Sequence, residues 1–188
     1  MEVALKALHS QIKRNDKKIG LVVCGGTALN ALGLVQRTTA DIDVVCFAEE
    51  VEDQIVVSRA EFPAWLLDAA GKVARDLGLP RDWINDGPAS LVEQGLPEGF
   101  SKRLTKVQIG SSLSVYYISR IDQIHFKLHA SADRGGYHVD DLMKLEPTES
   151  EIVEAAKWTM THDVSPAFRV ILIDLLRRLG FDDASKEL

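Results

Sequence analysis

Residues 19–47 read IGLVVCGGTALNALGLVQRTTADIDVVCF, and this stretch decides the fold. Its opening is apolar and rich in β-branched side chains, which predicts a short buried strand that ends at Gly25-Gly26. A helix is expected over Ala28–Leu34, with the hydroxyl of Thr27 capping its first turn. A polar loop then leads to a second strand that begins at Asp41. The order of strand, turn, helix and strand predicts an α/β core.

Patterns on either side of this stretch extend the prediction. They indicate a helix burying Leu5, Leu8 and Ile12, a weak strand at residues 55–57, a helix over residues 62–77, and a hairpin that turns at residues 110–112. Residues 80–100 are rich in Gly, Pro, Asn and Asp, so they are expected to form mostly loop.

The end of the chain is predicted to be helical. The expected elements are helices around residues 121–128 and 139–145, a third that opens with a capping box at residues 148–151, and a last one from Ser165-Pro166 to Gly180. We therefore expect a single α/β domain over residues 1–188. Its mixed-sheet core would span residues 19–118, and a helical part at residues 119–188 would pack on that core.

Composition limits the classes of partner. The 188-residue chain carries 22 Lys and Arg against 28 Asp and Glu, a net charge of −6. This excess of acid disfavours a long nucleic acid unless basic residues gather in a local strip. No apolar run approaches the roughly 18–20 residues that span a bilayer, so we expect a cytoplasmic protein with no membrane partner. Cys24 and Cys46 are expected to be small buried side chains, not metal ligands or a disulfide.

Asp41 and Asp43 flank Ile42 at the start of the second strand. Side chains alternate between the faces of a strand, so the two carboxylates share one face. Like charges at this spacing repel one another and favour a bound proton or cation. Oxygen ligands suit Mg²⁺ or Mn²⁺, which also hold substrate phosphates. Gly25 and Gly26 complement the pair, because without side chains they let a phosphate approach the backbone.

The order of these features is more specific than either feature alone. A glycine pair after a strand is often only a turn, and Asp-x-Asp is often solvated surface. Together, strand, glycine pair, helix, loop and Asp41-Ile42-Asp43 resemble the nucleotidyltransferase superfamily typified by DNA polymerase β. The loop RTTADIDVV strengthens the resemblance, since such enzymes often carry a basic residue and Ser or Thr before the first Asp. Here those residues are Arg37 and Thr39.

The resemblance implies a nucleotidyltransferase-like fold and a metal-dependent reaction with a nucleoside triphosphate (NTP). Mg²⁺ or Mn²⁺ would be held by Asp41 and Asp43. The residues implied in phosphate binding are Gly25, Gly26, Thr27 and Thr39, with Arg37 as a weaker candidate.

A second segment, residues 119–145, reads SRIDQIHFKLHASADRGGYHVDDLMKL. Lys127, Ser131 and Arg134 are spaced to share one side of a helix, where a Lys and an Arg could neutralise triphosphate charge. The alternative is a solvated helix face with a local charge pair between Asp133 and Arg134. The segment looks like the nucleotidyltransferases of abortive-infection and toxin–antitoxin systems, in which Lys-Leu-x-Ala precedes an Arg and Asp-Asp-Leu. By resemblance, Lys127 is a catalytic residue that contacts phosphate, Arg134 binds phosphate, and Asp140 or Asp141 joins the site.

One departure from the superfamily pattern concerns its third carboxylate, which usually lies on a later strand and acts on the attacking hydroxyl. The corresponding stretch here, residues 113–118, contains no acid. Either Asp122, Asp140 or Asp141 takes its place, or the site binds nucleotide and catalyses poorly. 

Three further polar positions have weaker signals. Asn85 could reach substrate from its loop, and His138 could orient an aspartate, contact phosphate or simply pack at a helix start. His125 and His129 have a zinc-compatible spacing, but no Glu follows His125, so they are expected to be polar helix residues.

These observations lead to one expected function and two alternatives. We expect transfer of a nucleoside monophosphate from an NTP to the hydroxyl of a tRNA, a protein or a small molecule. The resemblance adds a toxin-like role and a cognate antitoxin as partner. The alternatives are a non-catalytic nucleotide-binding module of the same fold and a small-molecule transferase of the antibiotic-modifying type.

Overall fold

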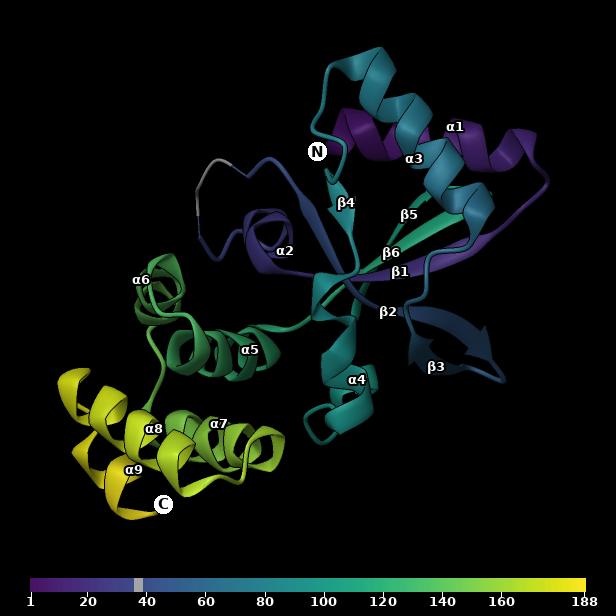
Figure 1. Ribbon diagram of the computed structural model, residues 1–188. Helices are drawn as coiled ribbons and strands as arrows, with labels where there is room; N and C mark the ends of the chain where they lie inside the picture. The colour runs from purple at the N-terminus through teal and green to yellow at the C-terminus, as the bar shows by residue number, and fades with distance from the viewer. Residues whose placement is uncertain (36–38) are drawn as a thin grey trace. The chain divides into compact units, whose positions relative to one another are not determined.

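The computed structural model describes residues 1–35 and 39–188, and the chain divides into two units, Met1–Ile118 and Ser119–Leu188 (Figure 1). In the described part of the first unit, six strands form one sheet: β1 (Ile19–Cys24), β2 (Ile42–Val51), β3 (Gln54–Arg59), β4 (Ile84–Asn85), β5 (Thr105–Gly110) and β6 (Leu113–Tyr117). The order is β3-β2-β1-β6-β5, and β4 pairs with β2. The pairs β1–β6 and β2–β4 are parallel and the others antiparallel. The predicted α/β fold with a mixed sheet is therefore confirmed.

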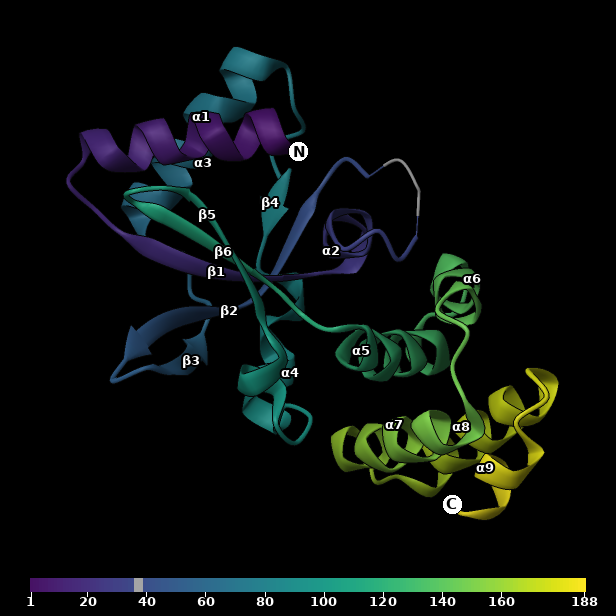
Figure 2. The ribbon, with the colours of Figure 1, turned by 180° about the vertical axis from the view of Figure 1, so that it is seen from behind.

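Two helices, α1 (Glu2–Arg14) and α3 (Ala64–Leu77), cover one face of this sheet in both views (Figures 1 and 2). The predicted apolar stripe of α1 is buried, with Leu5, Leu8 and Ile12 at most 2% exposed. These side chains join Ile42 and Val44 from β2 in the main core. The residues on either side of Ile42 therefore belong to the opposite face of the strand.

The region predicted to be mostly loop is more ordered than its composition suggests. It contains β4, the 3-10 turns η1 (Gly87–Ala89) and η2 (Phe100–Arg103), and α4 (Ser90–Gln94). Strand β4 is only two residues long and exists through its pairing with β2, so no local periodicity could reveal it. The fully buried Trp83 precedes it and donates its indole N–H to the carbonyl of Ala70 at 3.1 Å. Tertiary contacts hold this segment.

Both cysteines are buried, as predicted. Burial raises the pKa of the Cys46 thiol to about 12. Cys46 therefore stays protonated at neutral pH and acts as a small apolar side chain.

The second unit is helical: α5 (Arg120–Asp133), α6 (Tyr137–Lys144), α7 (Glu149–His162), α8 (Pro166–Arg178) and α9 (Asp182–Lys186). The predicted capping box at the start of α7 is present, with Thr148 and Glu151 exchanging side-chain and backbone hydrogen bonds. Ser165 caps α8, as its Ser-Pro sequence indicates. The short helix α9 was not predicted.

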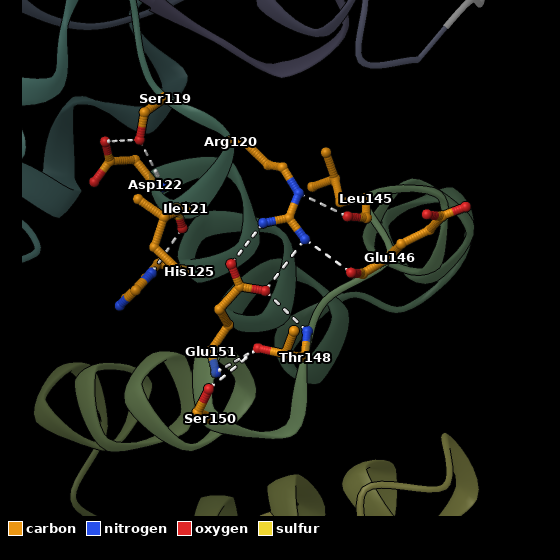
Figure 3. A network of polar contacts seen from close by, with 10 residues as sticks. All are labelled: Ser119, Arg120, Ile121, Asp122, His125, Leu145, Glu146, Thr148, Ser150 and Glu151. Carbon is orange, nitrogen blue, oxygen red and sulfur yellow. Dashed lines mark hydrogen bonds and ion pairs between the residues drawn. The ribbon is translucent and has the colours of Figure 1, made fainter.

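Arg120 ties three parts of this unit together (Figure 3). Its guanidinium donates to the carbonyl of Leu145 at 2.9 Å, to the carbonyl of Glu146 at 2.8 Å and to the carboxylate of Glu151 at 2.6 Å. The neighbouring guanidinium lowers the pKa of Glu151, and the backbone N–H of Thr148 acts in the same direction. This network joins the starts of α5 and α7 to the end of α6.

In the part of the chain that the structure describes, no helix has the length and apolar character needed to cross a membrane.

Candidate active site

The start of α2 (Gly25–Ala31) lies against the carboxylate of Asp43. Strands β1 and β2 are antiparallel, and their register places Cys24 opposite Asp43. Gly25 follows directly with a φ of +66°, and a Cβ atom there would lie 2.4 Å from Oδ2 of Asp43. Both the left-handed backbone and this close approach require glycine. Gly26 is buried in the same turn.

Thr27 has a different role from the predicted helix cap. Helix α2 begins at Gly25, so Thr27 lies inside its first turn, and the helix ends at Ala31 instead of Leu34. The Thr27 hydroxyl is buried and donates to the backbone carbonyl of Asp41 at 2.6 Å. This bond links the helix to the segment just before β2. Thr27 therefore holds the position of Asp41 and does not cap the helix.

Asp41 and Asp43 have separate hydrogen-bond donors. The hydroxyl of Thr39 donates to Oδ1 of Asp41 at 2.9 Å, and the side-chain amide of Asn85 donates to Oδ1 of Asp43 at 3.1 Å. Both aspartates are half-buried, whereas Ile42 between them is completely buried in the core. The predicted alternation therefore places the two carboxylates on the face away from Ile42.

Asn85 reaches Asp43 because β4 pairs in parallel with β2 and places these two residues opposite one another. The backbone N–H of Gly87 donates to the Asn85 side-chain oxygen at 3.0 Å, which orients the amide N–H₂ toward Asp43. A residue with only a weak sequence signal is thus fixed beside a carboxylate. Arg37, the other weak candidate of this region, lies outside the described residues.

The donor set at Asp41 and Asp43 suits a hard divalent cation. Among the residues that the structure describes, no group of three or more His, Cys, Asp or Glu side chains is placed to hold a metal ion. Mg²⁺ commonly binds proteins through one or two carboxylates and completes its shell with water and substrate phosphates. Two carboxylates, each with one oxygen fixed by a hydrogen bond, fit that mode of binding.

Comparison with known proteins identifies a family for most of the chain. Residues 3–166 match the family described as "nucleotidyltransferase of unknown function (DUF6036)". The chain belongs to this nucleotidyltransferase family. A search among curated proteins and another among solved structures each gave no match. The matched residues of the nucleotidyltransferase include the carboxylate pair and also helices α5 and α6 of the second unit.

Strand β6 of the nucleotidyltransferase contains no acid, so the third carboxylate of the superfamily pattern is absent from it. Asp122 follows in the first turn of α5 and is completely buried. Ser119 donates its hydroxyl hydrogen to Oδ2 of Asp122 at 2.6 Å and accepts the Asp122 backbone N–H at 3.3 Å (Figure 3). Asp122 therefore takes part in the cap of α5.

Lys127 and Asp141 form a buried ion pair within the second unit. The Lys127 ammonium donates to Oδ2 of Asp141 at 2.7 Å, and the two side chains are only 6% and 3% exposed. The same ammonium lies 5.5 Å from the ring centre of Tyr137. The pair joins α5 to α6, and the charge of Lys127 is already compensated within its own unit.

Arg134 does not share the environment of Lys127. Helix α5 ends at Asp133, and Arg134 is its exposed C-terminal cap residue, paired with Asp133 at 3.3 Å. Lys127 and Ser131, by contrast, are buried. The local charge pair with Asp133, the alternative given for this segment, is therefore present at Arg134.

Asp140 and His138 lie in the first turn of α6. Asp140 is exposed, whereas His138 is half-buried with its ring centre 4.1 Å from that of Tyr137. 

His125 and His129 lie on helix α5, as predicted, and belong to an aromatic cluster. Their ring centres lie 5.6 and 6.0 Å from that of Trp158 on α7. Burial lowers the pKa of His129, and the nearby His162 lowers it further. The sequence pattern missed this packing because Trp158 comes from another helix.

Proposed function

We propose that this nucleotidyltransferase transfers a nucleoside monophosphate from an NTP to an acceptor hydroxyl, in a reaction that depends on Mg²⁺ or Mn²⁺. The observation that carries the proposal is the contact between Gly25 and Asp43. It brings a backbone turn without side chains against one of two adjacent carboxylates. Phosphate and a divalent cation can then occupy neighbouring positions.

The residues of the first unit have separate roles in this reaction. Asp41 and Asp43 bind the cation, while Thr39 and Asn85 hold the two carboxylates in place through the hydrogen bonds described above. Gly25 and Gly26, with Thr27 and Thr39 nearby, border the phosphates. The bound cation supplies charge neutralisation for the phosphates and the departing pyrophosphate.

The reaction is a substitution at the α-phosphorus. The acceptor oxygen forms a bond to this phosphorus, the bond to the β-phosphate oxygen breaks, and pyrophosphate leaves. The hydroxyl proton passes to a carboxylate or to water. Positioning and charge stabilisation are the contributions expected of this chain.

The residues of the second unit enter the proposal through the motif resemblance. Lys127 and Arg134 would contact phosphate, and Asp122, Asp140 or Asp141 would replace the missing strand carboxylate. The same resemblance supports a toxin-like role in the cytoplasm with a cognate antitoxin as partner. 

The test is to incubate the protein with Mg²⁺ or Mn²⁺ and each α-labelled NTP. Total tRNA, a protein extract, the protein itself and uncharged small molecules are offered as acceptors. Asp43→Asn removes one charge of the pair, and Glu49→Gln, an exposed position on the same strand, is the matched control. We expect label in one acceptor with the wild type and Glu49→Gln, and none with Asp43→Asn. Equal labelling by Asp43→Asn would contradict the proposal.

A second candidate function is a nucleotide-binding module without turnover. The observation that favours it is the acid-free strand β6. It predicts that Mg²⁺-dependent NTP binding is measurable by calorimetry while no acceptor is labelled.

A further inference from the structure

A cavity of about 670 Å³ lies beside Asp41 in the first unit. Thr27 and Thr39 line it, and both also donate hydrogen bonds to Asp41. The Thr39 side chain in the cavity wall therefore bonds directly to the Asp41 carboxylate. Asp43 has different neighbours, Gly25 and Asn85. The two carboxylates therefore have different neighbouring residues.

The described lining of the cavity is partly apolar, and the charges of its side chains balance. Leu5, Val107 and Ile109 supply apolar surface. Among the described residues of the lining, the charged side chains are those of Glu2 and Lys6, which pair with each other at 2.5 Å. The other polar side chains of these lining residues are neutral amides and hydroxyls.

Tyr117, at the end of β6, is one of these neutral groups. Burial raises the pKa of its phenol, and the nearby Glu2 carboxylate raises it further. The phenol is therefore protonated at neutral pH and can donate a hydrogen bond. Asn30, on the α2 side of the cavity, adds an amide that can donate and accept.

This lining discriminates among the classes of acceptor. A tRNA end is a polyanion and requires clustered Lys and Arg. Among the described residues of the lining, the basic side chain is that of Lys6, which already pairs with Glu2. A basic acceptor would require excess acid, which the described residues of the lining do not supply. The volume falls within the roughly 300–1,000 Å³ of sites that enclose small molecules.

We propose that this cavity binds the acceptor of the transfer reaction, and that the acceptor is a small uncharged molecule bearing a hydroxyl group on a partly apolar body. The inference rests on the proposed function. The acceptor enters on the Asp41 side, the triphosphate lies on the side of Gly25 and Asp43, and Thr27 and Thr39 lie between the two. Its hydroxyl oxygen forms the new bond to the α-phosphorus, pyrophosphate leaves, and the proton passes to water.

The experiment uses phenyl β-glucoside, adenosine and uridine as uncharged probes. Their binding to the full chain is measured by saturation-transfer NMR, and their labelling by an α-labelled NTP is measured separately. Ala31→Trp fills the cavity from the end of α2, and Val3→Trp adds the same bulk at an exposed position of α1 outside the lining. We expect at least one probe to bind and become labelled. Ala31→Trp should weaken probe binding and probe labelling by tenfold or more and leave Mg²⁺·NTP affinity unchanged. Val3→Trp should change neither probe binding nor probe labelling.

Two outcomes overturn the inference, and they differ from failure of the proposed function. Labelling of tRNA or protein with no binding of any uncharged probe removes the acceptor role of the cavity but retains nucleotidyl transfer. Probe binding that Ala31→Trp leaves unchanged places the acceptor elsewhere. If the probes bind and no NTP labels any acceptor, the proposed transfer fails and the acceptor role fails with it.

Discussion

Each unit of the molecule contains one pair of charged residues that the family resemblance singles out, and the two pairs differ in their electrostatics. Asp41 and Asp43 carry the same charge, are half-buried, and take hydrogen bonds from the neutral side chains of Thr39 and Asn85. Lys127 and Asp141 carry opposite charges and are almost fully buried. An added cation would stabilise the first pair, whereas the charges of the second pair compensate one another.

Because of this difference, substitutions in the first pair should affect cation binding, and substitutions in the second pair should affect the stability of the fold. Removing a charge from the aspartate pair relieves repulsion, so the fold should tolerate it while cation binding is lost. Removing a charge from the Lys127–Asp141 pair leaves an uncompensated ion in the interior, so the fold should suffer first. Matched substitutions in the two pairs can therefore be compared directly.

The largest effect is expected for Asp141→Ala, which leaves the buried Lys127 ammonium without its carboxylate. We expect the free energy of unfolding to fall by about 3–5 kcal/mol, measured by urea denaturation. The exposed pair of Lys186 and Asp183 is the control, and Asp183→Ala should leave stability unchanged within error. Equal effects of the two substitutions would show that the burial of Lys127 is not energetically important.

The double variant Lys127→Met/Asp141→Leu sharpens this result. Replacing both charges by apolar groups should recover most of the lost stability. If Lys127 also contacts phosphate, the double variant folds but binds NTP more weakly, and more so at low salt than at high salt because the lost attraction is Coulombic. Unchanged NTP affinity at every salt concentration would assign Lys127 a structural role alone.

An intermediate effect is expected for Gly25→Ala at the first pair. Gly33 is the matched control, since it has a similar φ of +67° but open space where a Cβ would lie. Gly33→Ala should cost about 1–2 kcal/mol for the left-handed backbone alone. Gly25→Ala should cost about 2–4 kcal/mol, because its Cβ also collides with the Asp43 carboxylate. It should also abolish Mg²⁺·NTP binding, which Gly33→Ala should retain; equal behaviour of the two variants would contradict the contact.

The smallest effect concerns the Arg120–Glu151 pair of the second unit. The pKa of Glu151 is lowered from 4.5 in the folded protein, so its stabilisation is complete above pH 4.5 and is lost as the pH falls through the lowered value. Between pH 7 and pH 3.5, the wild type should lose more stability than Glu151→Gln, by less than about 1 kcal/mol because the pair is partly exposed. Thermal unfolding at both pH values measures the difference. Glu154→Gln, exposed on the same helix, should behave as the wild type.

The sequence predicted those features that depend on neighbouring residues. The first strand, the glycine pair and the alternation around Ile42 are local patterns, and they place Gly25 against Asp43 once the two strands pair. The capping box at Thr148 and Glu151 is equally local, and it is present.

Features that depend on contacts between distant segments could not be predicted in the same way. Strand β4 exists only through its pairing with β2, which is also how Asn85 reaches Asp43. The Thr27 hydroxyl donates to Asp41, in the segment just before β2, instead of capping its own helix. The cavity beside Asp41 combines α1, α2, β5 and β6, so no single stretch of sequence contains its signal.

The central claim is that Asp41 and Asp43 form a divalent cation site at which an NTP binds. The most direct test is a calorimetric titration of Mg²⁺·ATP, Mg²⁺·GTP, Mg²⁺·CTP and Mg²⁺·UTP into the wild type, Asp43→Asn and Glu49→Gln, with unfolding curves recorded for all three. We predict that the wild type and Glu49→Gln bind at least one of these NTPs. Asp43→Asn should bind none while keeping its stability within about 1 kcal/mol, since it removes charge and retains shape. Wild-type affinity in a folded Asp43→Asn protein would contradict the claim.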